Sequence, residues 1–220
     1  MVVFNLHAVR HGATEWSVSG QHTGRTDIPL TAAGRAQAES VKKHYQKQLS
    51  SKPFSSQFRY IFASPLSRAH ETARIVTSPD SSAVIEVDDD LMEMDYGRYD
   101  GRKTKDIQAD SEETKCWNLF RDGCPGGETA EDVGRRADRF IAKIRKLAAE
   151  TEGEDANAVR DILIFSHGHF LRVLAARWLG LPAKNGAMFA ISTAAVSILS
   201  YDHDETEPCI KMWSLPPTEV

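Results

Sequence analysis

Three apolar runs in this chain each end in polar, cation-rich residues and then pass into a helical pattern. "VVFNLHAV" is followed by "RHG", "YIFA" by "SPLSR", and "DILIF" by "SHGH". Short apolar runs that alternate with helices are typical of buried strands in a parallel sheet. Since parallel strands end at the same edge of a sheet, and ligands of open α/β folds bind at that edge, the three polar clusters are expected to meet there.

The remaining pattern indicates one domain, residues 1–220, of the α/β class. We predict a three-layer α/β/α sandwich with a mostly parallel central sheet. Expected caps are Thr31 for the helix at 31–49, Ser64 with Pro65 at the first position for the next helix, and a capping box of Thr129 and Asp132. The predicted elements are strands at 2–9, 60–64, 83–87, 161–166, 194–201 and 209–213, helices at 31–49, after 64, at 127–150 and at 168–180, a loop or marginal helix at 103–115 and a polar loop at 151–160.

Composition excludes several classes of protein. The net charge of −4 argues against general nucleic-acid binding and means that an anionic ligand must be attracted by a local cationic pocket. Three cysteines at wide spacing form neither a disulfide framework nor a zinc pattern. No run reaches the roughly 20 apolar residues of a membrane span, and the first apolar stretch is too short for a signal peptide, so a cytoplasmic protein is expected.

The polar clusters carry the groups of a phosphate site. If their strands are parallel neighbours, Arg10, His11, Arg68 and His167 converge near helix N-termini, where backbone N–H groups also attract anions. Arg68 falls in the first turn of its helix, where a cation opposes the helix dipole unless an anion is bound. The spacing of His167 and His169 allows a metal ligand pair, but no further ligand stands at a suitable spacing.

Four segments together resemble the histidine phosphatase superfamily, the phosphoglycerate-mutase-like proteins. "VRHGATEW" is similar to its R-H-G signature and "SPLSRAHETA" to its second arginine motif. "LMEMDYGRYDG" is similar to the segment that carries its catalytic acid, and "SHGHFLR" to its second histidine motif. The four occur in the family's order and span nearly the whole chain, which makes the resemblance specific.

The resemblance implies a role for each catalytic candidate. His11 would attack phosphorus as a neutral imidazole and hold the phosphoryl group. Arg10, Arg68 and His167 would stabilise the equatorial oxygens, so that positioned cations replace a metal and no cofactor is needed. Glu93 would protonate the leaving oxygen and then accept a proton from water.

Six further residues are candidates for binding the substrate. Tyr96, Arg121 and Arg172 could equally have a structural role, and Ser17 stands where the family often has asparagine. For His169 a role in supporting the site and a structural role stay equally open. The candidates are Ser17, Gln21, Thr23, Tyr96, Arg121 and Arg172.

The resemblance therefore implies a metal-independent phosphatase acting on a small phosphorylated sugar, with sedoheptulose 1,7-bisphosphate as the best single candidate. The insertion rich in arginine and lysine that mutases of the family carry after the catalytic acid is absent here, where "KTKDIQADSEETKC" has mixed charge, and this favours hydrolysis over mutase chemistry. A mutase, a broad phosphomonoesterase and a non-enzymatic phosphate-binding or docking module are the alternatives. Cysteine phosphatase spacing fails for Cys116 and Cys124, and the dehalogenase-like pattern at 202–206 stands too near the C-terminus. The sequence leaves the oligomeric state open.

Overall fold

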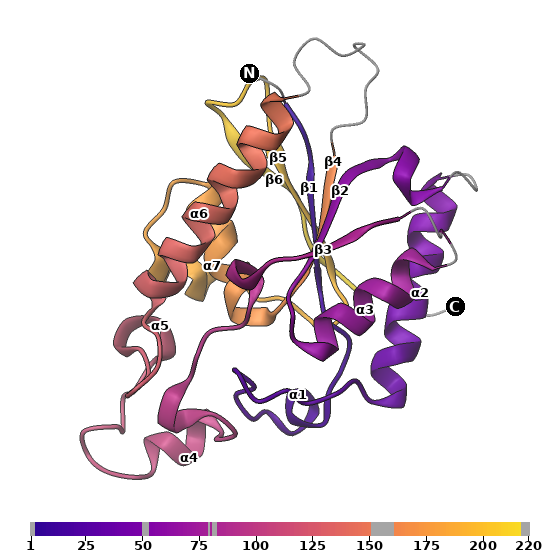
Figure 1. Cartoon of the computed structure of the whole chain (residues 1–220). Coiled ribbons are helices and arrows are strands. Elements are labelled where there is room, and N and C mark those ends of the chain that lie inside the picture. The colour runs from indigo at the N-terminus through magenta and orange to yellow at the C-terminus, as the bar shows by residue number, and fades with distance from the viewer. Residues whose placement is uncertain (1–2, 50–52, 79, 81–82, 151–160, 217–220) are drawn as a thin grey trace.

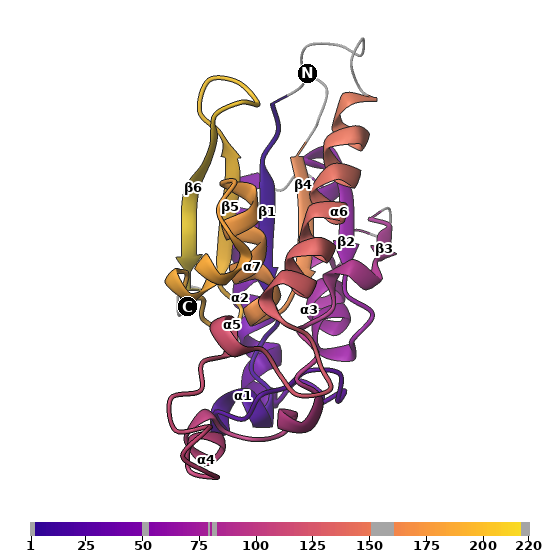
Figure 2. The ribbon, with the colours of Figure 1, turned by 90° about the vertical axis from the view of Figure 1, so that its left-hand side faces the viewer.

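The computed structural model describes residues 3–49, 53–78, 80, 83–150 and 161–216. Over these residues it forms a six-stranded sheet in the order β3-β2-β4-β1-β5-β6 (Figure 2). The strands are β1 (Leu6–Arg10), β2 (Phe58–Ala63), β3 (Ile85–Val87), β4 (Asp161–Ser166), β5 (Val196–Tyr201) and β6 (Pro208–Leu215). Strands β1 to β4 run parallel, whereas β5 and β6 pair antiparallel, so the sheet is mostly parallel, as predicted, with an antiparallel edge.

Helices cover both faces of this sheet, which confirms the predicted three layers (Figure 1). One face carries α2 and α3, and the other carries α6 and α7. The helices are α1 (Glu15–Ser19), α2 (Ala32–Leu49), α3 (Ser67–Thr77), α4 (Thr104–Gln108), α5 (Leu119–Asp122), α6 (Ala130–Ala149) and α7 (Gly168–Trp178), with 3₁₀ turns η1 (Phe54–Ser56), η2 (Asp89–Leu91), η3 (Gly97–Tyr99) and η4 (Ala183–Met188). The short helices α1 and α5 were not predicted, and the marginal helix expected at 103–115 is α4. The polar loop at 151–160 lies outside the described residues.

The helix starts follow from capping, with one correction. The Thr31 hydroxyl accepts from an amide in the first turn of α2, and the predicted capping box at the start of α6 is present. The prediction for α3 was wrong, because α3 begins at Ser67 and Ser64 does not cap it. Instead the carboxylate of Asp27, far away in sequence, accepts at 2.9 Å from both the Ser67 amide and its hydroxyl.

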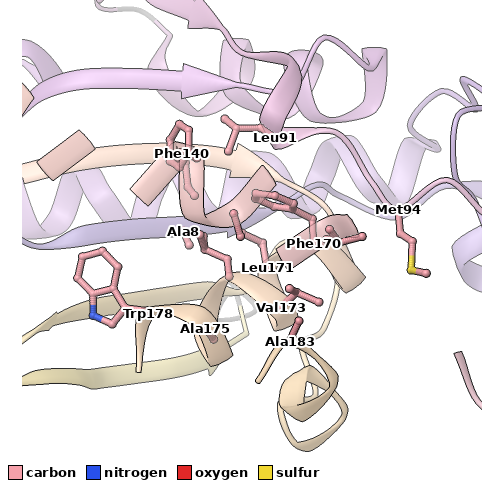
Figure 3. Close-up of a cluster of buried hydrophobic side chains, with 14 of the residues drawn as sticks. Ala8, Leu91, Met94, Phe140, Phe170, Leu171, Val173, Ala175, Trp178 and Ala183 are labelled. Atoms are coloured by element: carbon pink, nitrogen blue, oxygen red, sulfur yellow. The ribbon is translucent and has the colours of Figure 1, made fainter. Parts of the chain in front are cut away.

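Two hydrophobic clusters pack against the two faces of the sheet. Side chains of β1 alternate between them, with Leu6 and Ala8 in the cluster under α6 and α7 and Val9 in the cluster under α2 and α3. Figure 3 shows the first cluster, in which Phe140, Phe170 and Trp178 are fully buried. β1 is buried on both faces, and His7, the polar residue inside it, is buried with its Nδ1 3.3 Å from the Tyr45 hydroxyl.

A close approach of two glycines brings the end of β1 against α2. A Cβ on Gly12 would lie 2.2 Å from the Gly34 carbonyl oxygen, and one on Gly34 would lie 2.1 Å from that of Ala13. Beyond this point α1 and α4 lie at the carboxyl end of the parallel strands (Figures 1 and 2). The described helices include none that is long and apolar enough to cross a membrane.

Candidate active site

The three polar clusters meet at the carboxyl edge of the sheet, as the sequence predicts. In the parallel β1–β4 pair Arg10 stands opposite Ser166, and the His11 amide continues the ladder by donating to the Ser166 carbonyl at 3.0 Å. On the other side of β4 the Ser64 amide donates to the Phe165 carbonyl at 3.0 Å. The residues that follow β1, β2 and β4 are therefore neighbours, because β4 lies between the other two strands.

His11 is held as a neutral imidazole with one free nitrogen. Its Nδ1 lies 2.7 Å from the Gly12 carbonyl oxygen, which can only accept, so Nδ1 carries the proton and Nε2 keeps its lone pair. Burial, followed by the charges of Arg10 and Arg68, lowers the pKa of His11 well below its usual value and outweighs the bond to Gly12. An unprotonated Nε2 is the form of histidine that attacks phosphorus.

His167 is also buried and neutral, but both of its nitrogens have protein partners. Its Nδ1 accepts from the Nε of Arg68 at 3.2 Å, and its Nε2 lies 2.8 Å from the Ser64 hydroxyl. Burial and then the Arg68 charge lower its pKa well below the usual value. The His11 and His167 rings are 5.1 Å apart, so the two imidazoles lie next to each other in the pocket.

Arg68 is fully buried and its donors are directed mainly at the protein. Beyond His167 it donates to the carbonyl oxygens of Thr23, Gly24 and Thr26 at 2.8 to 3.1 Å. Burial lowers its pKa, and the negative charge of Glu93 opposes the shift. The carbonyl dipoles and the Asp27 carboxylate, 3.9 Å from Nη1, offset the positive charge at this helix start. Arg68 thereby ties the loop after α1 to the ring of His167.

Arg10, unlike Arg68, has a buried N–H group that donates to no other protein group among the residues that the structure describes. Its Nη1 donates to the Ile191 carbonyl at 2.7 Å, but its Nε atom is buried and has no hydrogen-bond partner in the described part of the chain. A Cβ on Gly168 would lie 3.2 Å from this Nε, so a glycine at this position avoids a close contact with the guanidinium. Because buried donors are almost always paired, an unpaired one next to His11 indicates an anion site.

Glu93 sits at the N-terminus of α7. Its Oε1 accepts from the amides of Met94 and Phe170 at 2.9 Å, and its Oε2 accepts from the His169 amide at 3.1 Å. The side chain is buried, and its charge acts on both Arg10 and Arg68. The structure thus brings Glu93 to the pocket from a segment that shares no strand with the other residues.

Tyr96 and His169 form a second polar contact beside the pocket. The Tyr96 hydroxyl lies 2.5 Å from Nδ1 of His169. Burial and then the charge of Glu93 raise the pKa of Tyr96 well above its usual value, so its hydroxyl keeps the proton and donates. The ring of His22, which sequence reasoning missed, lies 4.9 Å from the Tyr96 ring. The position of His22 between two predicted contact residues is the one signal that would have found it.

The loop candidates make contacts within the protein. The Ser17 hydroxyl accepts from the Thr14 amide at 2.8 Å and completes the capping box of α1. The side-chain Nε2 of Gln21 donates to the Gly101 carbonyl at 2.8 Å. The Thr23 hydroxyl lies 3.4 Å from the Gln21 carbonyl, whereas its own carbonyl binds Arg68. The structure shows a structural role for Ser17 and Gln21, and substrate contacts by these residues stay a prediction.

The last two candidates for substrate binding, Arg121 and Arg172, lie near a cavity of about 340 Å³ between α5 and η4. Arg121 lines it but is ion-paired with Asp122 at 2.7 Å, and Arg172 stacks at 4.5 Å on the ring of Phe120. That ring also lies 5.4 Å from the ring of His169, so Phe120 separates the cavity from the pocket. The cavity is lined by Asn118, Phe120, Arg121, Lys184, Asn185, Ala187 and Met188. Lys184, a second cation, was not predicted, because no motif includes it.

A possible cation site lies elsewhere. Within the ranges that the structure describes, Asp202, His203 and Glu207 in the hairpin between β5 and β6 are a group whose ligand atoms lie within 4.8 Å of one another. All three side chains are exposed. The hairpin also contains the dehalogenase-like pattern, which agrees with its interpretation as a coincidence in a loop.

The chain belongs to the histidine phosphatase superfamily (branch 1), whose profile it matches over residues 6–213. It is 39% identical to sedoheptulose 1,7-bisphosphatase of Saccharomyces cerevisiae, over 94% of this chain and 78% of the yeast protein. It is 36% identical to an acid phosphatase of Mycobacterium tuberculosis, over 90% of this chain and 87% of the relative.

Solved structures agree with this assignment. One is the structure of a functionally characterised open reading frame from Mycobacterium tuberculosis, with a TM-score of 0.80 at 33% identity. The match covers 98% of this chain and 99% of that protein chain. A mycobacterial glucosyl-3-phosphoglycerate phosphatase in complex with VO₃ has a TM-score of 0.79 at 28% identity and covers 96% and 99%. The predicted phosphoglycerate-mutase-like fold is confirmed.

Proposed function

We propose that this phosphatase hydrolyses a small phosphorylated sugar through a phosphohistidine on His11, without a metal. The observation that carries the proposal is the neutral His11 with a free Nε2, next to the unpaired buried donor of Arg10. A group of this kind needs no cofactor to attack phosphorus, and the guanidinium stabilises the charge that develops on the phosphoryl oxygens.

The reaction has two balanced steps. In the first, the Nε2 lone pair of His11 bonds to phosphorus, the bond to the sugar oxygen breaks, and Glu93, which enters this step in its protonated form, donates its proton to that oxygen. In the second, Glu93 takes a proton from water, the water oxygen bonds to phosphorus, and the bond to Nε2 breaks. Inorganic phosphate leaves, and His11 and Glu93 return to their first states.

Two contacts favour hydrolysis over transfer between substrates. In the segment between Tyr99 and α5, where mutases of the family carry an insertion rich in arginine and lysine, this chain has mixed charge. Two of its four cations are ion-paired, Arg102 with Asp110 and Lys115 with Glu112 at 3.2 Å. A phosphoglycerate mutase is therefore the weaker alternative.

The cavity between α5 and η4 supports a substrate with a second anionic group. Arg121 and Lys184 both line it, in a protein of net negative charge, and only the ring of Phe120 lies between it and His169 of the pocket. The segments "RTDIPLT", "FRDGCPGGET" and "HGHFLR" are similar to sedoheptulose-1,7-bisphosphatase, in line with the identity to the yeast enzyme. Sedoheptulose 1,7-bisphosphate is thus the best single candidate, and a broad phosphomonoesterase, as the name of the acid phosphatase relative suggests, is the alternative.

A panel of sugar monophosphates and bisphosphates, with released phosphate as the readout, tests this function. We expect release to survive excess chelator and to be inhibited by vanadate, which mimics the five-coordinate transition state. Activity that chelation removes and a divalent ion restores would contradict the metal-independent mechanism. A phosphate-binding or docking module would release no phosphate from any substrate.

Lys184→Ala tests the second anion site. We expect the KM for a sugar bisphosphate to rise about 10-fold, the value of one charge-assisted hydrogen bond, with the KM for the monophosphate unchanged. The matched control is Lys211→Ala, which removes a lysine on β6, a strand that does not line the cavity. Equal KM changes for both substrates would favour the broad phosphomonoesterase.

A further inference from the structure

Arg136 of α6 is a nearly buried arginine that binds the main chain leading to Glu93. Its side chain is only 10% exposed. Its Nη1 donates to the carbonyl oxygens of Asp90 at 2.7 Å and Met92 at 3.0 Å, and its Nη2 lies 3.5 Å from the carbonyl oxygen of Glu93. One guanidinium therefore holds both Glu93 and the residues just before it.

Glu128 completes this contact from the other side. Its carboxylate accepts from Arg136 at 2.7 and 2.9 Å, and it also accepts from the Asp95 amide at 2.8 Å. The Glu128 amide in turn donates to the Asp95 carbonyl at 2.8 Å. Burial alone would raise the pKa of Glu128, but Arg136 and the Asp95 amide lower it below its usual value, so Glu128 stays ionised. The pair thus holds the chain before and after Glu93.

The Glu93 segment depends on such contacts because it has no neighbouring strand. Its main-chain groups still need hydrogen-bond partners, and Ser166 supplies one by donating to the Leu91 carbonyl at 2.7 Å. The side chains of Leu91 and Met94 anchor the segment in the hydrophobic cluster of Figure 3. These contacts hold the ends of the segment, whereas Arg136 binds Glu93 itself.

The same guanidinium also packs on the partner of the Glu93 carboxylate. It lies 5.3 Å over the ring of Phe170, whose amide donates to Oε1 of Glu93. Arg136 therefore contacts both halves of the arrangement that places this carboxylate, the main chain of Glu93 and the first turn of α7.

We propose that the Arg136–Glu128 pair is a positioning device for Glu93. It holds the carboxyl group where it can reach the leaving oxygen, and the contacts of both side chains are with the protein rather than with the phosphate pocket. This inference rests on the proposed function, in which Glu93 transfers the proton. A small displacement of a proton donor can cost about 10²-fold in rate, so loosening the pair should reduce catalysis before it disrupts the fold.

The test compares leaving groups, since only a poor leaving group needs the proton. The substrates are p-nitrophenyl phosphate, phenyl phosphate and glycerol 2-phosphate, in the order in which their leaving groups increasingly need a proton donor. Arg136→Lys keeps the charge but cannot bind several carbonyls and Glu128 together. We expect it to lower kcat on glycerol 2-phosphate by about 10–10²-fold and to have little effect on p-nitrophenyl phosphate. An equal loss on all three substrates would overturn the inference and leave the pair a structural role only.

A control variant and a second test variant complete the experiment on the Arg136–Glu128 pair. Arg139→Lys changes an exposed arginine on the same helix, which binds the side chain of Asp90 rather than a main-chain carbonyl, and the dependence on leaving group should not change. If Arg136→Lys does not fold, Glu128→Gln makes the same test, because Gln retains an acceptor for Arg136. An unchanged leaving-group dependence in folded Glu128→Gln would equally overturn the inference.

The double variant separates this inference from the proposed function. When Glu93→Gln is already present, adding Arg136→Lys should cause no further loss on glycerol 2-phosphate, because there is no proton left to position. If Glu93→Gln alone leaves the leaving-group dependence unchanged, the proposed proton donor is wrong. If Glu93→Gln changes the leaving-group dependence and Arg136→Lys does not, the positioning role is wrong. It is also wrong if the losses on glycerol 2-phosphate caused by the two substitutions multiply in the double variant.

Discussion

Histidines in the phosphate pocket and in the β5–β6 hairpin have pKa shifts of opposite sign. In the pocket, burial and two arginines lower the pKa values of His11 and His167 well below the usual range. In the hairpin, a bond of 2.7 Å to Glu207 and the charge of Asp202 raise the pKa of the exposed His203.

The difference teaches which histidines can do which chemistry. A buried imidazole among arginines stays neutral and keeps a lone pair, which a nucleophile requires. An imidazole among exposed carboxylates holds its proton more tightly and is a poor nucleophile at the same pH. The eight histidines of this chain are equivalent in the composition, and only their surroundings separate them.

The largest expected effect comes from removing His11, the proposed nucleophile. His11→Ala should lower kcat by about 10⁴-fold or more, because the covalent step is lost. In the wild-type protein, rapid trapping with labelled substrate should give an acid-labile, base-stable phosphoryl label that this variant lacks. A label on cysteine or aspartate would contradict the mechanism.

The next largest effect separates the two arginines of the pocket. Arg10→Lys should lower kcat about 10²-fold, the cost of one lost donor to a transition-state oxygen, with little change in Tm. Arg68→Lys should lower Tm more, because it loses bonds to the loop carbonyls and to His167. Thermal unfolding and kinetics of both variants make the comparison, and equal losses of Tm would show that Arg10 is structural as well.

A smaller effect concerns the stability of the fold at acidic pH. Below the ordinary histidine pKa of 6.5 the unfolded chain takes up protons that the folded pocket does not, so the free energy of unfolding should fall as the pH falls. Each such histidine contributes at most about 1.4 kcal/mol per pH unit. His11→Gln should reduce this slope in urea unfolding between pH 5 and 7. An unchanged slope would mean that His11 binds protons equally in both states.

The smallest effect is expected in the hairpin, and its sign is opposite. Because the folded pKa of His203 is raised, its ion pairs stabilise the protein below the unfolded pKa, and this contribution is lost as the pH rises through the folded value. His203→Gln should therefore be slightly less stable than wild type at pH 5.5 and equal to it at pH 8, with kcat unchanged. A loss of activity in this variant would show that the hairpin takes part in the reaction.

The family motifs predicted much of the pocket. Arg10, His11 and His167 follow apolar runs, and a parallel sheet can only bring such run ends together, so their meeting followed from the pattern. The start of α3 did not, because its capping residue is Asp27, which comes from a loop forty residues earlier. Lys184 was missed for the same reason, since no local pattern links it to the site, whereas His22 had a local signal in its position between Gln21 and Thr23.

The sequence by itself determined the order of the strands and the four long helices along the chain, the residues at the strand ends and the family, because apolar periodicity and motifs are local properties of the chain. Only the tertiary structure decided which nitrogen of His11 is free, which arginine keeps an unpaired donor, and how Glu93 reaches the first turn of α7. Those properties depend on burial and on partners far away in sequence, such as Gly12 against Gly34 and Arg136 against the Glu93 segment. Hydrogen bonds and desolvation act over a few ångströms of space, so they become definite only when the chain has folded.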